Sequence, residues 1–482
     1  MKLLTKSKYL IGLQCPKWLW TIFNDPKSLP DASVQQQAIF EQGNLIGELA
    51  KELYPEGVDL STQEFSENIR KTKFLLNNKS IIFEGALITA NLYARADILV
   101  PNEDGYDILE VKSSTKVKDI NIHDLSFQKH VFEQYGVKIK NCFLVHINNQ
   151  YIKEGNIDPK EFFTITDCTD KVAEFYEEID NRIKDMFDII RLKEIPEMKL
   201  TECEAVYDCP IHDAELETLP KGNVFELYRG GKLSNELFNK GIINIKDISE
   251  DVKLNSKQKI QFNCEKDGEI YVDKEKVKDF LDKLKEPLYF LDFETFNPAI
   301  PLFDKMKPYQ RVPFQFSLHI LENDELKHHE FLYNRDDDPR FDFGEELSKV
   351  IGEKGSIIVF NQAFELGVLK ELADAYPFFK EMFENISERV VDLIIPFRNF
   401  NYYNPKQKGS CSIKKILPAL TGKGYEDLEI GNGGDACVLY PEITYGDVSD
   451  EEKQKVRDNL LEYCKLDTEG MVWILDELRK LI

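Results

Sequence analysis

Residues 288–294 read LYFLDFE, and this stretch decides how the last part of the chain is expected to fold. A short apolar run of this kind predicts a buried strand, and Pro287 directly before it prevents a preceding helix from continuing. Side chains alternate between the two faces of a strand, so Asp292 and Glu294 are expected on the same face near its end. The strand therefore presents two carboxylates side by side.

Two later segments predict further acidic groups near this strand. Residues 356–373, SIIVFNQAFELGVLKELA, predict a buried strand that turns into a helix at Glu365. Residues 458–481 predict a long amphipathic helix, on which Tyr463 and Asp467 are four positions apart and share a face. Together the acids can hold two divalent ions that activate water and steady a leaving oxygen, with Tyr463 orienting the water. Without metal they would repel one another and their pKa values would rise.

The order and spacing of these residues resemble the DEDD exonucleases, in the subclass that has a tyrosine. The matching motifs are Asp292-x-Glu294, Asn361-x-x-Phe364-Glu365 and Tyr463-x-x-x-Asp467. The resemblance implies a ribonuclease H-like fold over residues 287–482, with Mg²⁺ or Mn²⁺ held by Asp292, Glu294, Glu365 and Asp467. Glu365 stands where that family has aspartate, and its longer side chain can change the metal geometry.

Residues 86–112, ALITANLYARADILVPNEDGYDILEVK, predict a β-hairpin in the first part of the chain. Asp97 lies on its first strand, and Glu110 and Lys112 share one face of the second. Two converging carboxylates suit Mg²⁺ or Mn²⁺, and the ammonium of Lys112 can position water or offset charge on the phosphate. The alternative is an ordinary hairpin with a surface Glu–Lys pair.

An amphipathic helix (120–136) and a buried strand (141–147) follow the hairpin. With Gln128-x-x-x-Phe132 on the helix, the pattern resembles the RecB-like branch of the PD-(D/E)XK nucleases, in which a tyrosine stands at the position of Phe132. The resemblance implies that Gln128 orients the lysine or the metal site; a helix-surface amide is the alternative. The branch carries a metal-binding histidine on an earlier helix, where this chain has Gly47. Glu48, in preference to Glu41, is the substitute ligand, unless both are solvated carboxylates.

Three cysteines surround this first part of the chain. Some RecB-like nucleases, including the CRISPR-associated exonucleases, clasp their ends with a [4Fe–4S] cluster, and the resemblance implies such a role for Cys15, Cys203 and Cys209. The fourth cysteine is missing, and His212 or Cys168 can stand in. The alternatives are free, partly buried thiols and a zinc site.

The chain is therefore expected to be α/β, with two mixed-sheet nuclease domains joined by a small helical segment. The predicted boundaries are residues 1–215, 216–286 and 287–482. Within the middle segment, residues 234–262 loosely resemble a helix-hairpin-helix element, with a second helix beginning near Ile245; a plain helical linker is the preferred interpretation. The module order, the Cys-Pro near the start and the loop Gly409–Lys414 resemble an uncharacterised bacterial family that carries a domain of unknown function.

Composition limits the partners and the compartment. A net charge of -24 over 482 residues counts against nucleic-acid binding, although bound metal offsets catalytic carboxylates and phosphate needs only a local basic groove. Residues 406–415, KQKGSCSIKK, can supply phosphate contacts, or form a solvated loop. No long apolar run predicts a membrane-spanning helix or a membrane partner. Scattered cysteines and the absence of a recognisable leader indicate a reducing, cytoplasmic location.

Two functions remain open from the sequence. The first is a metal-dependent nuclease, specifically a DNA exonuclease in repair or defence; the preference for DNA follows from the RecB-like resemblance alone. The second is a nucleic-acid-binding or scaffold protein in which one or both sites are catalytically weakened. Glu365, Phe132 and the missing cysteine favour the second function. Asp392, which follows the second motif, is expected to support the site or to cap a helix. Nucleic acid is the expected partner in both cases, and the sequence predicts no particular protein partner.

Overall fold

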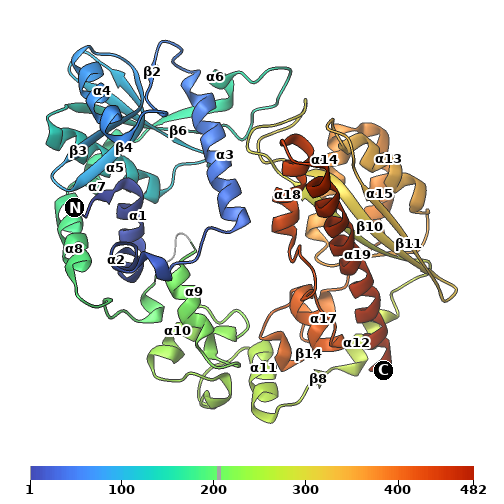
Figure 1. Ribbon diagram of the computed structural model, residues 1–482. Helices are drawn as coiled ribbons and strands as arrows, with labels where there is room; N and C mark the ends of the chain where they lie inside the picture. Colours follow the sequence, from blue (N-terminus) through green and yellow to red (C-terminus); the bar gives the residue numbers. More distant parts are fainter. Residues whose placement is uncertain (1, 204–207) are drawn as a thin grey trace. The chain divides into compact units, whose positions relative to one another are not determined.

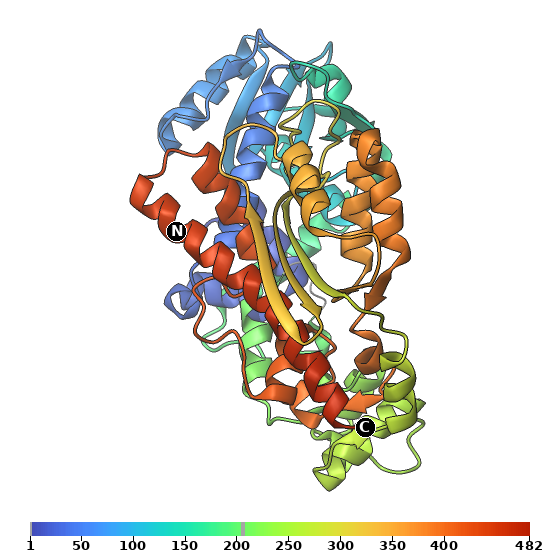
Figure 2. The same ribbon diagram turned by 90° about the vertical axis from the view of Figure 1, so that its right-hand side faces the viewer.

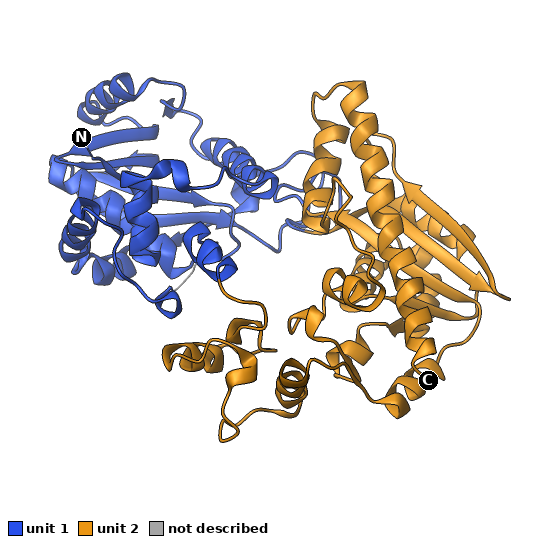
Figure 3. Cartoon of the chain, turned by 60° about the horizontal axis from the view of Figure 1, so that its bottom comes forward, with its two compact units in different colours: residues 1–218, 298–309 blue, residues 219–297, 310–482 orange. Residues whose placement is uncertain are grey.

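The computed structural model describes residues 2–203 and 208–482, and it divides into two compact units (Figure 3). Unit 1 comprises Met1–Thr218 with Pro298–Tyr309, and unit 2 comprises Leu219–Asn297 with Gln310–Ile482. Each unit contains a mixed β-sheet with helices packed against it. The prediction of an α/β chain with more than one domain is confirmed.

The division differs in two places from the expected boundaries. The segment expected as a linker, residues 216–286, groups mostly with unit 2. Residues Pro298–Tyr309, assigned above to the last domain, pack with unit 1. There the Lys153 N–H donates to Met306 O at 3.0 Å and the Lys305 N–H donates to Lys153 O at 2.9 Å. The strand that carries Asp292 is thus followed by an excursion into the other unit's core.

The sheet of unit 1 is built around the predicted hairpin. Strands β3, β4 and β5 are antiparallel, β5 and β6 are parallel, and β6 and β7 are antiparallel. The short strands β1 and β2 run parallel to β4 and β3. The bounds are β1 Leu4–Thr5, β2 Val58–Asp59, β3 Ile82–Thr89, β4 Leu92–Pro101, β5 Tyr106–Lys112, β6 Ile139–Ile147 and β7 Phe163–Asp167.

Helices cover both faces of this sheet, and two separate hydrophobic clusters mark the two faces. Helix α5 (Asp119–Tyr135) connects β5 to β6, ends at Gly136 with φ 102°, and packs on one face (Figure 1). Helix α3 (Val34–Lys51) packs on the other face. The remaining helices of unit 1 are α1 Lys6–Gln14, α2 Pro16–Asn24, α4 Phe65–Asn77, α6 Pro159–Phe162, α7 Thr169–Tyr176, α8 Ile179–Arg191 and α9 Pro210–Glu217.

Unit 2 has a five-stranded sheet in the order β11-β10-β9-β12-β13, with β9 (Leu288–Phe296) at its centre. Strand β9 is antiparallel to β10 and parallel to β12. Tyr289, Leu291 and Phe293 pack among helices α13–α15, whereas Phe290 packs on the opposite face. The other bounds are β10 Val312–Glu322, β11 Glu325–Leu332, β12 Ser356–Val359, β13 Val390–Asp392, α13 Arg340–Val350, α14 Ala363–Ala375 and α15 Lys380–Glu388.

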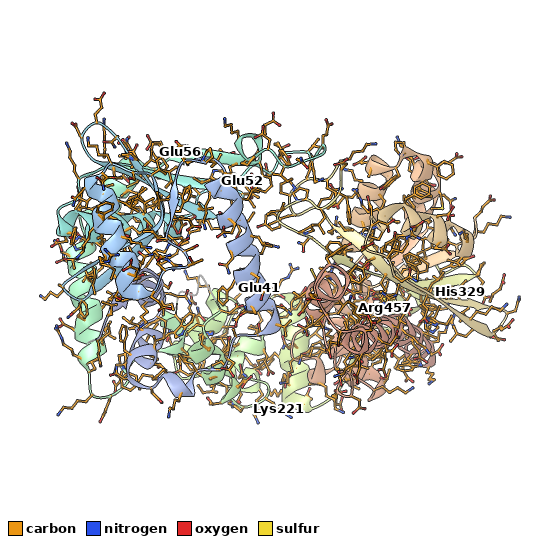
Figure 4. The ribbon with its side chains drawn as sticks, turned by 45° about the horizontal axis from the view of Figure 1, so that its top comes forward. Glu41, Glu52, Glu56, Lys221, His329 and Arg457 are labelled. Atoms are coloured by element: carbon orange, nitrogen blue, oxygen red, sulfur yellow. The ribbon has the colours of Figure 1, made fainter. Side chains whose placement is uncertain are left out.

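Helix α19 (Asp450–Lys480) runs along the opposite face, against β9 and β10 (Figure 2). Ser449 caps its start, three acidic residues occupy its first turn and two basic residues its last, so its charges complement the helix dipole. Arg457 on this helix (Figure 4) donates to the carbonyls of Leu332 and Tyr333 at 3.0 and 2.8 Å. These bonds fix the helix against the end of β11.

The start of unit 2 is helical, but not as the sequence suggested. The helix expected from Ile245 is wrong: Ile245–Asp247 form a single 3₁₀ turn. The next α-helix begins at Ser256, because Asn255 and Gln258 form a capping box there. The other elements of unit 2 are α10 Lys232–Asn239, α11 Ser256–Asp267, β8 Tyr271–Val272, α12 Lys274–Leu281, α16 Ile395–Arg398, β14 Tyr402–Tyr403, α17 Ile413–Thr421 and α18 Gly433–Tyr445. Among all described residues, no helix combines the length and apolarity needed to cross a bilayer.

Candidate metal and catalytic site

Three of the predicted acids of unit 2 converge in space. Asp292 and Glu294 alternate onto the same face of β9, and Asp467 comes from α19, which packs across that face. Each offers a carboxylate oxygen that lies within 4.8 Å of the others. Residues distant in the sequence thus form one compact set of oxygen ligands, the type that Mg²⁺ and Mn²⁺ prefer.

Glu365 approaches this cluster from the first turn of α14. It is 2% exposed, and its Oε2 has no hydrogen-bond partner among the described residues. Its charge raises the pKa of Asp292 and of Glu294, although burial is the larger cause for both. Its oxygens lie outside the group of three within 4.8 Å. Buried carboxylate oxygens are normally paired, so this oxygen lacks a cation or donor.

The electrostatics of the cluster favour a bound cation. Burial, together with Asp467 and Glu365, raises the pKa of Glu294 to about 8. Burial also raises the pKa of Glu365 to about 8 and that of Asp467 to about 6, and it raises the pKa of Asp292 well above its usual range. In the absence of metal the cluster therefore retains protons near neutral pH. A divalent cation supplies the missing charge, so the donor set fits Mg²⁺ or Mn²⁺.

Two tyrosines and a lysine border the carboxylates. Tyr463 is 4% exposed and bonds with Asp467, while the Tyr425 hydroxyl donates to Asp467 Oδ1 at 2.5 Å. The Lys414 ammonium lies 5.4 Å from the centre of the Tyr463 ring. A Cβ added to Gly433, the first residue of α18, would lie 3.4 Å from Glu294 Oε2, so this helix start also borders the site.

Asp392 supports the site by capping backbone groups. It is buried, and its carboxylate accepts the N–H groups of Asn361 at 2.9 Å, Gln362 at 3.3 Å and Ile394 at 3.1 Å. Asn361 has φ 81°, a conformation uncommon for residues other than glycine. Asp392 thus holds the turn from which α14 projects Glu365.

The residues predicted in unit 1 also meet, in a buried hydrogen-bond network. The Lys112 ammonium lies 2.5 Å from Glu110 Oε1 and 2.8 Å from Asp124 Oδ2. The Gln128 amide donates to Glu110 Oε2 at 2.6 Å and to Asp124 Oδ1 at 2.9 Å. Glu110, Asp124 and Gln128 are fully buried. Gln128 is therefore not a helix-surface amide; it fixes the two carboxylates that hold Lys112.

Lys6 occupies the space between the acids of unit 1. Its ammonium lies 2.8 Å from Glu110 Oε1, 3.6 Å from Asp97 Oδ1 and 3.9 Å from Asp124 Oδ1. Asp97 is tied down as well, because its Oδ2 accepts the Val111 N–H at 2.8 Å. Burial alone would raise the pKa of Glu110, but the two lysines hold it well below its usual range. A metal ion at Asp97 and Glu110 would have to displace Lys6.

The structure places Glu48 apart from this network. Glu48 is exposed on α3 and pairs with Lys51 at 2.5 Å, while Glu41, on the same helix (Figure 4), accepts from Gln37 at 3.0 Å. Glu84 is closer: the register of β3 and β4 puts it opposite Asp97, with φ 56°. Burial raises the pKa of Glu84, and Glu110 adds to this.

Several residues of the two sites escaped the sequence analysis. Asp124 could have been found from the sequence, since it precedes Gln128 by one helical turn and shares its face of the helix. Cys464 directly follows Tyr463, and its Sγ lies 3.6 Å from Asp292 Oδ2. Phe132 is completely buried in the core of unit 1 and provides no hydroxyl. Lys6, Glu84 and Tyr425 carried no motif. The partners of Lys6 and Tyr425 lie far away in the sequence, whereas Glu84 lies on the strand next to that of Asp97.

The cysteines of unit 1 are also brought together. The Sγ atoms of Cys15, Cys203 and Cys209 lie within 4.8 Å of one another. Cys15 and Cys203 line a small cavity, and His212 lines it as well. Cys168 is not part of this group; its Sγ lies 3.6 Å from the carbonyl oxygen of Thr166. Residues 204–207, between Cys203 and Cys209, lie outside the described residues.

Comparison with known proteins reveals relatives whose function is also open. Residues 289–412 match a family model described as "Domain of unknown function (DUF2779)", a stretch that contains Asp292, Glu294 and Glu365 but not Tyr463 or Asp467. For this stretch, the expected likeness to a family with a domain of unknown function is confirmed. An uncharacterised protein of Ureaplasma parvum serovar 3 is 27% identical over 246 residues, which is 46% of this chain and 35% of the relative. An uncharacterised protein of Mycoplasma genitalium is 28% identical over 228 residues, 43% of this chain and 34% of the relative. The matched part of the chain thus spans about a third of each relative's length.

The raised carboxyl pKa values predict a metal- and pH-dependent stability of unit 2. Acids whose pKa is raised by folding stabilise the fold at low pH and lose this contribution as pH rises through the folded values. In EDTA, the melting temperature of unit 2 is expected to fall between about pH 5 and pH 8. Mn²⁺ should restore it, more at pH 8 than at pH 5. The probe is the fluorescence of Trp473 after Trp18 and Trp20 are replaced by Phe. Equal melting temperatures with and without Mn²⁺ at pH 8 would contradict this account.

The position of Lys6 predicts a second effect, confined to unit 1. Lys6→Met leaves the buried Glu110 and Asp124 and the partly exposed Asp97 with Lys112 as their remaining close ammonium. The substitution is expected to destabilise the metal-free unit by about 3 kcal/mol. Mn²⁺ should recover part of the loss, because an ion can then take the ammonium's place. Urea unfolding followed by Trp18 and Trp20 fluorescence measures both effects. The control is Lys8→Met on the same helix, whose ammonium lies 4.4 Å from the centre of the Phe23 ring. A Lys6→Met protein as stable as this control would show that the network does not need the ammonium.

Proposed function

We propose that this chain is a metal-dependent nuclease whose principal catalytic centre is the carboxylate site of unit 2. The observation that carries the proposal is the approach of Asp292, Glu294 and Asp467 to within 4.8 Å, with Glu365 beside them bearing an oxygen that has no partner among the described residues. Three buried acids, Glu294, Glu365 and Asp467, beside the partly exposed Asp292 are electrostatically unfavourable unless they bind cations. Divalent ions bound to oxygen ligands are the usual agents of phosphodiester hydrolysis in proteins.

The finer fold assignments belong to this proposal. The strand-and-helix origin of the four acids, and the tyrosine that precedes Asp467 by one turn, support a DEDD-type ribonuclease H-like domain in unit 2. In unit 1 the joined Glu110, Lys112 and Gln128 support a RecB-like PD-(D/E)XK domain.

A cationic pocket in unit 2 supports nucleic acid as the substrate. Tyr228, Arg229, Phe360 and Arg398 line it, together with Asn361, one turn before Glu365, and Ser412 and Ile413, directly before Lys414. Lys257 reinforces it by donating to Arg398 O at 2.6 Å. Aromatic faces stack on bases and guanidinium groups bind phosphate, so the pocket suits a single strand leading toward the carboxylates. This local positive charge meets the objection raised by the net charge of -24.

The residues of unit 2 divide the work of hydrolysis. Mg²⁺ or Mn²⁺ bound by the carboxylates would activate water and stabilise the charge that develops on the phosphate and the leaving oxygen. The Tyr463 hydroxyl, beside Asp467, orients the attacking water. Lys414 lies close enough to the acids for Asp467 and Glu294 to act on its pKa, which burial lowers. Its ammonium would contact the phosphate of a bound substrate. The start of α18 at Gly433 presents backbone N–H groups that favour an anion.

Unit 1 supports a second phosphodiesterase site less strongly. Its acids, lysine and glutamine are assembled, but Lys6 already occupies the position at which a cation would bind. This observation favours the second candidate function for unit 1, a nucleic-acid-binding or scaffold module with weakened catalysis. Such a division of labour makes unit 2 the catalytic half of the protein. DNA in repair or defence remains the preferred substrate and setting, on the RecB-like resemblance alone.

Degradation of end-labelled DNA and RNA oligonucleotides with Mg²⁺ or Mn²⁺ tests the proposal. Asp292→Asn is expected to lower metal-dependent cleavage by about 100-fold or more, since it removes a ligand charge from the centre. Asp97→Asn is expected to have a much smaller effect. The matched control is Asp476→Asn, on α19, whose half-exposed carboxylate lies 3.6 Å from Arg479. If wild type and the Asp292→Asn/Asp97→Asn double variant behave alike on both nucleic acids, the nuclease proposal is wrong.

A further inference from the structure

Three cysteines meet at the point where the two ends of unit 1 come together. Cys15 lies between α1 and α2, Cys203 follows α8 and a short 3₁₀ turn, and Cys209 directly precedes α9. Their Sγ atoms lie within 4.8 Å of one another. Cys15 and Cys209 are buried and Cys203 is partly exposed. Three thiols this close are typical of a metal site or of a disulfide with a spare cysteine, and no disulfide joins them here.

The size of the site disagrees with a [4Fe–4S] cluster. Such a cluster takes one thiolate on each of its four irons, which keeps the ligand sulfurs apart. The described residues provide three thiols here, and the cavity that Cys15 and Cys203 line has a volume of ≈ 10 Å³, about the space of one water molecule. By contrast, tetrahedral zinc with Zn–S bonds of about 2.3 Å separates its sulfurs by roughly 3.8 Å. The sulfur spacing and the cavity fit one ion.

A fourth ligand is available in the same cavity. Its lining includes two other side chains that bind zinc, His212 and Glu215. Glu215 is engaged with the Lys17 ammonium at 2.5 Å, whereas His212 follows Cys209 by three residues in a Cys-Pro-Ile-His sequence. The ring nitrogens of His212 lie outside the group of three sulfurs within 4.8 Å, so the imidazole has to rotate toward the ion on binding. The short turn between Cys209 and His212 allows this rotation. Three sulfurs and one imidazole nitrogen complete a tetrahedron.

We propose that Cys15, Cys203, Cys209 and His212 bind a single structural zinc ion in unit 1. Binding releases the protons of the thiols to solvent and closes the coordination shell, so the ion takes no part in hydrolysis. It ties the turn between α1 and α2 to the segment after α8, residues far apart in the sequence. The site is independent of the function proposed for unit 2.

Metal analysis of the purified full-length chain tests this assignment. One zinc per chain is expected, and substitution with Co²⁺ should give the visible absorption of a tetrahedral thiolate site. Cys209→Ser and His212→Ala should each lower zinc affinity by at least about 10-fold, the loss caused by removal of even an outer partner of a ligand. The control is Cys168→Ser, a buried cysteine of the same unit outside the cluster, which should retain the zinc.

The alternatives give different results. Four irons per chain with a brown colour would overturn the proposal in favour of a cluster. A chain without metal, whether its cysteines are free or joined in a disulfide, would overturn it as well. If Cys209→Ser fails to accumulate, a thiol-specific mercurial added to the wild-type chain decides the matter. Release of one zinc supports the site, and release of none contradicts it. A chelator that removes the zinc should also lower the melting temperature of unit 1 but not that of unit 2.

Discussion

The gathering of carboxylates away from water, where burial and neighbouring acids raise their pKa values, is the constraint on which the rest of this structure depends. Asp292, Glu294 and Asp467 are held within 4.8 Å by a central strand and a long helix whose other residues form the hydrophobic core of unit 2. Core packing keeps the acids together. Burial is the first cause of the raised pKa of all three, and repulsion from neighbouring acids adds to it for Asp292 and Glu294. A bound cation offsets the cost of such an arrangement. A group of several carboxylate oxygens is the ligand set that divalent cations prefer.

The two units contain similar ingredients but neutralise them differently. In unit 1, Lys6 and Lys112 lie among Asp97, Glu110 and Asp124 and hold the pKa of Glu110 low, whereas burial and the charge of Glu110 raise the pKa of Asp97 to about 7. Two ammonium groups thus offset most, but not all, of the acidic charge without any ion. In unit 2, Asp467 bonds with Tyr425 and Tyr463, and the Lys414 ammonium interacts with Asp467 and Glu294 but forms no ion pair with them among the described residues. The difference supports the proposal that unit 2 is the catalytic half and unit 1 a binding module. The proposed zinc ion would then stabilise the fold of unit 1, whose carboxylate network already contains two ammonium groups.

Short-range sequence patterns made the strands, the helices and the positions of the acids on them predictable. Alternation along residues 288–294 and the four-residue spacing of Tyr463 and Asp467 placed the acids on the correct faces, because strand and helix periods are local properties. Contacts between distant segments were not predictable: Lys6 reaches Glu110 across more than a hundred residues, and Pro298–Tyr309 join the other unit. Glu48 was chosen for its place in a family pattern, but α3 turns it toward solvent, and Glu84 lies opposite Asp97 instead. The segment at Ile245 forms a single 3₁₀ turn, because the residues that cap the next α-helix come only at Asn255.

Anomalous X-ray diffraction from crystals grown with Mn²⁺ tests most directly whether the carboxylates of unit 2 bind a divalent ion. It locates the ion itself, whereas stability and cleavage report only its effects. The account predicts a manganese peak coordinated by oxygens of Asp292, Glu294 and Asp467, with Glu365 turned toward it. No peak between Asp97 and Glu110 is expected while Lys6 remains in place. A carboxylate cluster in unit 2 that stays free of manganese at millimolar concentrations near pH 8 would contradict the account.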